Sequence, residues 1–518
     1  MSASQEKLIR KQQREEGTDK QQLAAKKAEK AKKRKEKNWT IGIAVVVVIF
    51  AGILFWNSSF LNGHFAAVKI GDQSYTAAEL SFFYNTTYNN FVSQYGDYIS
   101  YIGLDTTKDP ADQEYEDGKT WADYFKESAI ATMQEITALY EEAQKNDFVL
   151  SEEDQASLDS SLENMKTSYT GSGYNSADEY LSAAYGKGCT VEVISGILEK
   201  YYISQAYAQQ KYDSLTYTSA DLKAYYEENK NDLDQYTYIA YLADGSVKED
   251  TTDTTEPSAS PDAAAEDAAK AEAMAAAKKI ADAIVDGSSS AETFKVAVFT
   301  QTGTEISDST TQGSSLSATY ADWLKDASRK EGDKTVIETD TGYYALYFVS
   351  RSDNSYKTIN VRHILIKAVA SEDGTYTDEA KAEAKSKAET LLAAWQAGDA
   401  TEDSFAKLAN ENSEDTGSNT TGGLYEGVYK GQMVTEFNDW CFAEGRKTGD
   451  TAIVFNQDSN YCGYHVVYFV GQSDKTYADT LAEDGIRNKD YSAWKDALLA
   501  NYETSAGWTA FLVKKAGN

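Results

Sequence analysis

Cysteine, proline and histidine are scarce in this sequence of 518 residues, with three of each. Three cysteines are too few for the disulfide framework that stabilises small secreted domains. Cys441 and Cys462 fall within one expected domain, and the spacing allows either a disulfide between them or two free thiols. Residues 64–235 contain neither a metal-ligand spacing nor a glycine-rich phosphate loop. We therefore expect no metal ion and no cofactor.

Positive charge is scarce everywhere except at the N-terminus. Residues 1–38 hold 13 Lys and Arg against 6 Asp and Glu, whereas the remaining residues hold 37 against 76. The net charge of −32 for the whole chain does not reveal this division between a basic N-terminus and an acidic remainder. The chain is too long for a single core, and its 41% hydrophobic and 12% aromatic content is typical of folded domains. We expect several domains, and no nucleic-acid partner.

One long uncharged run occurs, over residues 40–56, between Trp39 and Trp56. At about 1.5 Å per residue such a run just crosses a bilayer core. The basic cluster before it predicts a cytoplasmic tail at 1–38, a transmembrane signal anchor at 39–57 and an extracellular remainder at the cell membrane. A cleavable signal peptide is the alternative, but no good small-residue cleavage site and no lipobox cysteine follow.

Two apolar runs near the C-terminus carry two of the three histidines. His363 lies within Val361–Ile366 and His465 within Gly463–Val470, and both runs are typical of short strands. An Ala/Lys/Glu-rich stretch at about 378–397 predicts a helix between them. Further motifs follow this helix in the order Phe405-Ala-Lys-Leu-Ala, Ser413, Ser418, Gly422-Gly423, Gly431-Gln432-Met433 and Glu436-Phe437.

This order and spacing resembles the parvulin family of peptidyl-prolyl isomerases over roughly 110 residues, and the combination is more specific than any single motif. The sequence departs from the usual Gly-Gly-Asp-Leu-Gly at Leu424 to Gly427. The region 64–235, with a helix-capping box at Thr76 to Glu79, is similar in its opening to SurA/PrsA-type extracytoplasmic foldases of the Gram-positive type. That resemblance implies a helical chaperone-like N-terminal domain at 64–235, with C-terminal helices at 474–518 packed on it.

An internal repeat completes the expected architecture. Residues 332–349 echo 449–470, and the strand-like run at 236–242 stands where 361–366 stands later. Residues 236–355 therefore predict a degenerate parvulin-like domain, with a disordered loop at 245–262, ahead of an isomerase domain at 358–473. The expected fold class is α+β: a helical domain plus two parvulin-like units, each an antiparallel sheet wrapped by helices.

The resemblance implies the roles of eight side chains in the second unit. Those expected in the catalytic set are His363, His465, Asp415 and Cys462. Those expected to bind substrate are Met433, Phe437, Phe442 and Gln432. Arg362 has two equally weighted interpretations, a surface charge or a contact to a client polypeptide.

Two functions follow from these expectations. The first is a membrane-anchored peptidyl-prolyl isomerase and foldase, which acts on unfolded or partly folded secreted polypeptides with Xaa-Pro bonds. The second is a non-catalytic holdase whose parvulin-like units only bind extended chains. The intact His363, His465, Met433 and Phe437 favour the first, and the degenerate repeat keeps the second open. No oligomeric state is inferred.

Overall fold

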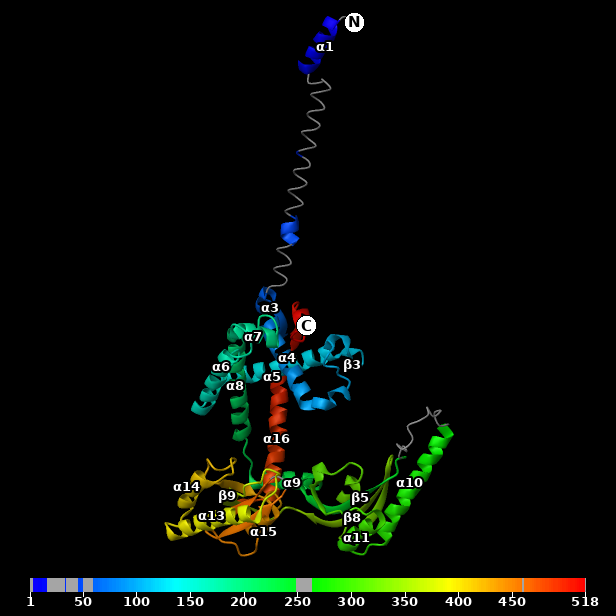
Figure 1. Cartoon of the computed structure of the whole chain (residues 1–518), viewed down its shortest axis with the longest axis vertical. Coiled ribbons are helices and arrows are strands. Elements are labelled where there is room, and N and C mark those ends of the chain that lie inside the picture. The colour runs from blue at the N-terminus through cyan, green and yellow to red at the C-terminus, as the bar shows by residue number, and fades with distance from the viewer. Residues whose placement is uncertain are drawn as a thin grey trace. The chain divides into compact units, whose positions relative to one another are not determined.

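The computed structural model describes residues 3–15, 33, 45–49, 59–247, 263–458 and 461–517. The chain divides into two compact units (Figure 1). Unit 1 comprises Met1–Leu215 and Asp490–Asn518, and unit 2 comprises Thr216–Lys489. The expected mixture of helices and sheets is confirmed.

Most of the predicted anchor and tail lies outside the described residues. The tail contributes α1 (Ala3–Glu15), whose described side chains are exposed, and the anchor contributes only the helical residues 45–49. Among the helices of the described residues, none has the length and apolar character needed to cross a membrane. The loop predicted at 245–262 also lies outside the described residues from 248 onward.

Unit 1 combines a small sheet with a bundle of helices. The sheet has the order β13-β1-β2, formed by β1 (Ala66–Ile70), β2 (Gln73–Thr76) and β13 (Thr504–Ala506). Its helices are α3 (Phe60–His64), α4 (Ala77–Tyr95), α5 (Trp121–Lys145), α6 (Glu152–Thr167), α7 (Ala177–Tyr185) and α8 (Val191–Ser214). A short hairpin of β3 (Glu114–Glu116) and β4 (Lys119–Thr120) and the 3₁₀ turns η1 (Gly96–Ser100), η2 (Pro110–Asp112) and η4 (Ala510–Leu512) complete it.

The capping box predicted at the start of α4 is present. Thr76 Oγ1 accepts the backbone N–H of Glu79 at 3.3 Å, and the Glu79 carboxylate accepts the backbone N–H of Thr76 at 2.8 Å. These bonds satisfy two backbone donors that a helix N-terminus leaves without partners. From this start α4 buries Leu80, Phe83 and Tyr84 in the largest apolar core of unit 1.

From Asp490 onward the C-terminal residues belong to unit 1, whereas the start of the expected C-terminal segment, residues 474–489, belongs to unit 2. The described residues of the segment contain fewer α-helices than the two or three expected. One long helix, α16 (Tyr477–Leu499), is followed by β13 and η4. Trp494 and Leu498 pack against Leu139 and Tyr207, and β13 pairs antiparallel with β1. Pairing with β1 provides hydrogen-bond partners for the backbone of the short segment after α16. This segment therefore forms a strand.

Unit 2 contains two domains with the same sheet order. Repeat A (Gln235–Ser352) has the order β6-β5-β8-β7, and repeat B (Lys357–Thr476) has the order β10-β9-β12-β11. The strands of repeat A are β5 (Gln235–Asp244), β6 (Ser309–Gln312), β7 (Lys334–Thr339) and β8 (Gly342–Ser352). The strands of repeat B are β9 (Lys357–Lys367), β10 (Leu424–Val428), β11 (Thr451–Gln457) and β12 (Cys462–Thr476). Every pairing is antiparallel.

Each sheet has one apolar core on each face. In repeat A one face packs on α10 (Ala263–Asp286) and α11 (Ala291–Thr302), and the other on η3 (Gly313–Ser315) and α12 (Ala321–Lys325). In repeat B one face packs on α13 (Asp378–Ala397) and α14 (Glu402–Asn412), and the other on α15 (Thr435–Cys441). Helix α13 has the bounds that the sequence predicts. Helix α9 (Ser219–Leu233), expected in the N-terminal domain, belongs to unit 2, where Leu222 and Leu233 pack near Ala482.

Both repeats contain the same Trp-Arg-Asp corner just before their third strand in chain order, which is β7 in repeat A and β11 in repeat B. In repeat B the Arg446 guanidinium lies 3.9 Å from the ring centroid of Trp440, donates to the Trp440 carbonyl and reaches Asp450 at 3.5 Å. In repeat A, Arg329 makes the same three contacts to Trp323 and Asp333, at 4.1 Å, 3.0 Å and 3.3 Å. In the sequence repeat only the Gly-Asp end of this corner is evident, at residues 332–333 and 449–450.

We predict that Arg446→Ala lowers the stability of repeat B by about 1–3 kcal/mol, because it removes charge-assisted hydrogen bonds from a half-buried corner. Hydrogen exchange of β11 and β12 measures the change. Lys447→Ala is the matched control, since Lys447 is exposed and contacts Asp450 through its backbone N–H. Equal protection in both variants would contradict the structural role of Arg446.

Candidate active site

The site is built on two neighbouring strands that place two histidines on one face of the repeat B sheet. His363 of β9 pairs with Val467 of β12, and His465 of β12 pairs with Leu365 of β9, so the two histidines are diagonal neighbours. Side chains two residues apart on a strand share a face. The imidazoles are stacked with a centroid separation of 5.2 Å, and their Nδ1 atoms lie 3.0 Å apart.

Asp415 holds the outer nitrogen of His363. Its Oδ2 lies 2.8 Å from His363 Nε2 and also accepts the hydroxyls of Ser418 at 2.6 Å and Tyr425 at 3.0 Å. The hydrogen bond from His363, with that from Ser418, keeps the pKa of the Asp415 carboxyl well below its usual range despite partial burial. Asp415 is therefore an ionised acceptor, and His363 Nε2 carries a proton.

Tyr461 contacts the outer nitrogen of His465, with its hydroxyl oxygen 2.8 Å from Nε2. Burial, with a smaller contribution from the neighbouring His363, lowers the pKa of His465 to about 3. His465 is thus neutral near neutral pH and holds one ring proton. The described geometry connects Asp415, His363, His465 and Tyr461 in one hydrogen-bonded series.

Two proton arrangements satisfy this series. With His363 neutral, His465 donates from Nδ1 to His363 Nδ1 and accepts the Tyr461 hydroxyl proton at Nε2. With His363 protonated, His363 donates to His465 Nδ1, and His465 donates from Nε2 to the Tyr461 oxygen. A proton added at His363 therefore changes the tautomer of His465 and reverses the hydrogen bond to Tyr461.

Phe437 forms the floor beneath the two imidazoles. Its ring stands edge-on to His363 at 5.7 Å and to His465 at 5.4 Å, and the side chain is only 1% exposed. Met433 is half-buried in the same apolar cluster. The expected proline-binding residues therefore divide into a buried floor and an accessible apolar side chain.

The other two expected substrate-binding residues lie farther along the same segment. Gln432 is exposed, and its side-chain oxygen accepts the backbone N–H of Tyr429 at 3.1 Å. Phe442 is half-buried and meets the ring of Tyr356 edge-on at 6.0 Å. Neither makes a hydrogen bond or ring contact with the histidines in the structure described here.

The structure places Cys462 away from this set, which corrects its assignment to the site. Cys462 lies three residues before His465 on β12, and an odd separation along a strand turns a side chain to the opposite face. It is fully buried in the core beneath α13 and α14, where burial raises the pKa of its thiol. All three cysteines are free and buried, so no disulfide joins Cys441 and Cys462.

The glycine pair allows the loop before β10 to pass directly against β9. Gly422 and Gly423 have φ values of +72° and +69°, and a Cβ on Gly423 would lie 2.1 Å from the carbonyl oxygen of His363. The Arg362 guanidinium donates to the Gly422 carbonyl at 3.0 Å and pairs with Glu402 at 2.9 Å. Arg362 thus holds this loop in place, and the interpretation as a client contact has no support here.

Sequence reasoning missed two tyrosines of the site. Tyr425 falls in the segment that departs from the usual parvulin pattern, where no motif marks it. Tyr461 precedes β12 and is four residues from His465, a separation that on a continuous strand would place it far from the ring. Tyr461 lies just outside β12, so only the fold brings its hydroxyl to His465.

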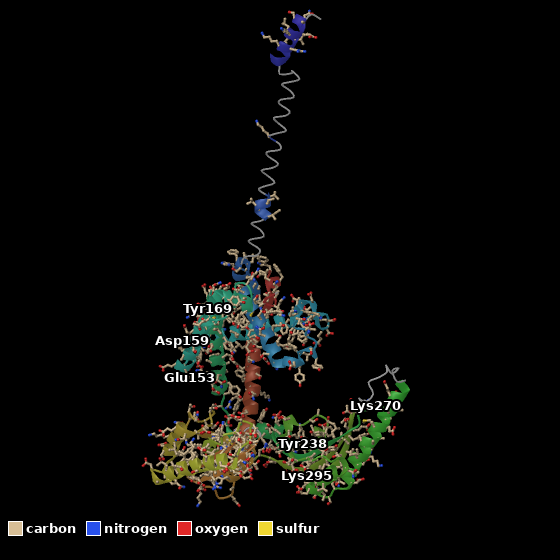
Figure 2. The ribbon with its side chains drawn as sticks, in the orientation of Figure 1. Glu153, Asp159, Tyr169, Tyr238, Lys270 and Lys295 are labelled. Carbon is tan, nitrogen blue, oxygen red and sulfur yellow. The ribbon has the colours of Figure 1, made fainter. Side chains whose placement is uncertain are left out.

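Repeat A keeps this scaffold without the histidines. Tyr344 stands at the position of His465, and Ala240, which pairs with Leu346, stands at the position of His363. Counting from the shared corner, Tyr320 stands at the position of Phe437, and it meets Tyr344 at 5.3 Å and Tyr238 at 5.5 Å. Figure 2 marks Tyr238 within this domain. No imidazole pair can form there.

A match to a family model establishes the class of repeat B. Residues 344–473 match the family model described as the PPIC-type PPIASE domain. Repeat B is therefore a parvulin-type peptidyl-prolyl isomerase domain, and that expectation is confirmed. The match begins within β8, ahead of the expected start at residue 358.

Solved structures similar to the chain include bacterial foldases. The peptidylprolyl isomerase PrsA from Bacillus anthracis is 23% identical, over 29% of this chain and 59% of that one, with a TM-score of 0.18. PrsA from Bacillus subtilis is 14% identical, over 74% and 86%, with a TM-score of 0.28. A structure of SurA-like chaperones from Campylobacter jejuni is 24% identical, over 27% and 51%, with a TM-score of 0.16.

The chain spans between half and three fifths of the first PrsA structures that it matches, with 59% for Bacillus anthracis and 52% for Bacillus cereus. No curated protein matches the chain.

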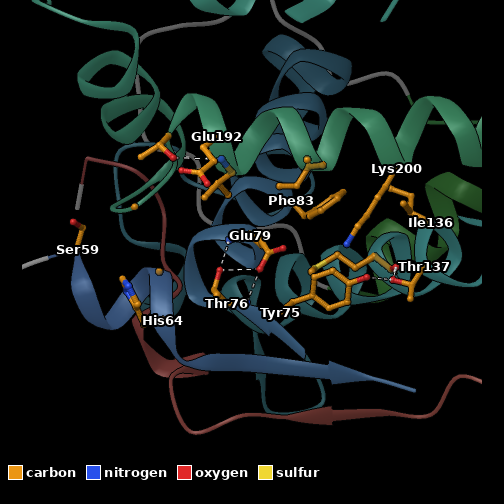
Figure 3. A pocket seen from close by; sticks show the side chains of 17 residues that line it. Ser59, His64, Tyr75, Thr76, Glu79, Phe83, Ile136, Thr137, Glu192 and Lys200 are labelled. Atoms are coloured by element: carbon orange, nitrogen blue, oxygen red, sulfur yellow. Dashed lines mark hydrogen bonds between the residues drawn. The ribbon is translucent and has the colours of Figure 1, made fainter. Parts of the chain in front are cut away.

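Unit 1 contains a separate cavity of about 550 Å³ between α4, α5 and α8 (Figure 3). Phe83, Met133 and Ile136 contribute apolar surface. Lys200 points into the cavity, with its ammonium 5.0 Å from the ring centroid of Tyr75. Among the described residues, no cluster of side chains that could bind a metal ion lines the cavity. Its volume and its mixture of apolar and polar lining residues are typical of a ligand-binding site.

We predict that repeat B loses stability as the pH falls below about 6.5. Because the pKa of His465 is lowered to about 3 in the folded state, the unfolded chain binds a proton that the folded chain does not. This difference removes about 1.4 kcal/mol per pH unit between about pH 6.5 and 3. Asp415 acts in the same direction below its ordinary pKa of about 3.8, since its pKa is also lowered in the folded state.

Peptide-resolved hydrogen exchange of β12, corrected for intrinsic rates, measures this slope between pH 6.5 and 5. His465→Gln should flatten it, since the variant has no imidazole to protonate at position 465. An identical slope in parent and variant would show that His465 is not the buried group responsible.

Proposed function

We propose that the chain is an extracytoplasmic peptidyl-prolyl isomerase and foldase, held at the cell membrane by residues 39–57. Its proposed substrates are unfolded or partly folded secreted polypeptides that contain Xaa-Pro bonds. The observation that supports this proposal best is the hydrogen-bonded series Asp415, His363, His465 and Tyr461 above Phe437. The parvulin-type domain assignment supplies the reaction class.

The isomerisation requires only a site of suitable shape with a few fixed polar groups. Rotation about an Xaa-Pro bond crosses a barrier of about 18–20 kcal/mol and breaks no covalent bond. A catalyst therefore needs to hold the proline ring on an apolar surface and to favour an amide twisted out of resonance. Met433 supplies accessible apolar surface, while the buried imidazoles keep Phe437 and the sheet in one geometry. No nucleophile is needed, which agrees with the absence of Cys462 from the site.

The test compares turnover with folding for two pocket residues in the full chain. Met433→Ala removes roughly 60 Å² of apolar surface, worth about 1.5 kcal/mol, so kcat/KM for a proline peptide should fall about tenfold while the domain stays folded. Phe437→Ala should lose both activity and stability, by about 3–5 kcal/mol, because the ring is fully buried.

A protease-coupled proline-peptide assay and thermal melting give the two readouts. Val369→Ala is the matched control, since Val369 is a 79% exposed apolar residue of repeat B. If Met433→Ala and Phe437→Ala both isomerise at the parent rate, repeat B does not act as the isomerase and the holdase becomes the better account.

A second candidate function, the binding of unfolded chains without isomerisation, is favoured by the cavity of unit 1. Gly196 of α8 lines that cavity, and a Cβ there would meet no atom within 4 Å. Gly196→Leu therefore adds apolar volume at the cavity wall, at a position with room for its Cβ. Polypeptide side chains that enter the cavity would be excluded by this variant.

We predict that Gly196→Leu suppresses aggregation of an unfolded model protein severalfold less well than the parent, with unchanged kcat/KM on short proline peptides. Light scattering measures the suppression. Glu199→Leu adds the same side chain to an exposed position of α8 and serves as control. Full suppression by Gly196→Leu would exclude the cavity as a client site.

A further inference from the structure

A cluster of exposed aromatic residues is formed in unit 1 by α3 and the segment that follows β13. Phe60, Trp508 and Phe511 are 43%, 58% and 55% exposed, in a chain whose other large apolar side chains are mostly buried in cores. The rings of Phe60 and Phe65 lie 6.1 Å apart, and those of Phe65 and Trp508 lie 5.2 Å apart.

The backbone joins these residues into one surface. Thr509 Oγ1 donates to the Phe65 carbonyl at 3.1 Å, and the Gly507 N–H donates to the Ala67 carbonyl at 2.8 Å. Helix α3 and the C-terminal segment accordingly lie side by side (Figure 1). We call the exposed residues of α3 and of 508–515, together with Lys187, the aromatic-basic face.

Lysines flank the aromatic residues of this face. Lys187, Lys514 and Lys515 line a hollow beside Phe511, and no Asp or Glu lines it. Lys187 and Lys514 are exposed, whereas Lys515 donates to the Thr106 carbonyl. Such a grouping stands out because residues 39–518 hold 76 acidic against 37 basic residues.

We propose that the aromatic-basic face lies on the headgroup region of a bilayer that contains anionic lipid. Tryptophan and phenylalanine are favoured at the membrane interface, and lysines are attracted to anionic headgroups. The uncharged run 40–56 ends four residues before Phe60, so a chain anchored by that run would present this face to the bilayer. This inference rests on the proposed function, because the proposed membrane anchor is what brings the aromatic-basic face to the bilayer.

The proposal commits to a lipid surface rather than to a client polypeptide. Client binding explains exposed aromatic rings, but it does not explain why lysines gather at the point where the chain leaves residues 40–56. A lipid surface explains both features. The polypeptide is therefore the competing outcome of the experiment.

The experiment reconstitutes the full chain in vesicles of equimolar phosphatidylcholine and phosphatidylglycerol, with and without brominated acyl chains. Bromine quenches tryptophans that reach the bilayer. The difference between the parent and Trp508→Phe isolates the Trp508 signal, and the signal left in Trp508→Phe includes Trp39 and Trp56, which report insertion of the anchor. We expect both components to be quenched.

The charge of the face is tested in the same vesicles. Lys187→Glu with Lys514→Glu should reduce the fraction of quenched Trp508 severalfold, since each lysine contributes about a fivefold preference for an anionic surface. Lys223→Glu with Lys270→Glu makes the same charge change at exposed lysines of unit 2 and should change nothing.

Three outcomes separate the claims. If the signal left in Trp508→Phe is unquenched, the anchoring in the proposed function fails. If that signal is quenched while Trp508 emission is unaffected by bromine, the aromatic-basic face does not contact lipid and the inference is overturned. The inference is also overturned if Trp508 responds to an added unfolded polypeptide and not to brominated lipid.

Discussion

The hydrogen bond between the Nδ1 atoms of His363 and His465 is the constraint on which the rest of the site depends. Two imidazoles that share one Nδ1–Nδ1 hydrogen bond cannot both carry a proton at Nδ1, so one donates and the other accepts, and their outer nitrogens need different partners. Asp415 supplies an ionised acceptor on one side, and Tyr461 supplies a hydroxyl that donates or accepts on the other. The buried ring of Phe437 then closes the space below both imidazoles. A buried polar network of this kind is stabilising only when every member has its partner.

The two repeats show which parts of the scaffold are independent of that network. Repeat A has the same strand order and the same Trp-Arg-Asp corner, yet a tyrosine and an alanine replace the two histidines of the pair. Tyr344 contacts Tyr320, which bonds through its hydroxyl to Tyr238 at 3.3 Å, so the space is filled by a different set of partners. The sheet and its corner therefore fix the fold, and the histidines add the chemistry of the site.

Much of the fold of repeat B could be predicted because its signals are local. Helix α13 follows its Ala/Lys/Glu-rich composition, and the two histidine strands follow their β-branched residues. Side-chain direction was harder to predict. Cys462 was assigned to the site through resemblance, although its odd separation from His465 already places it on the other face. Tyr461 could not be found from the sequence, because it lies outside β12 and no local pattern predicts its contact with His465. Phe437 was expected as a pocket wall, and only the packing of α15 on the sheet shows that it is a buried floor.

The most direct measurement of this account is nitrogen-15 NMR of the histidine rings in the full chain. The chain has three histidines, so the spectrum contains only His363, His465 and the exposed His64. The account predicts that His465 stays neutral from pH 7 to about 4, with its pKa near 3, and that its Nδ1 shows a coupling to His363 Nδ1 through the shared proton. A His465 ring that becomes protonated near its ordinary value of 6.5, with no coupling to His363, would contradict the central claim.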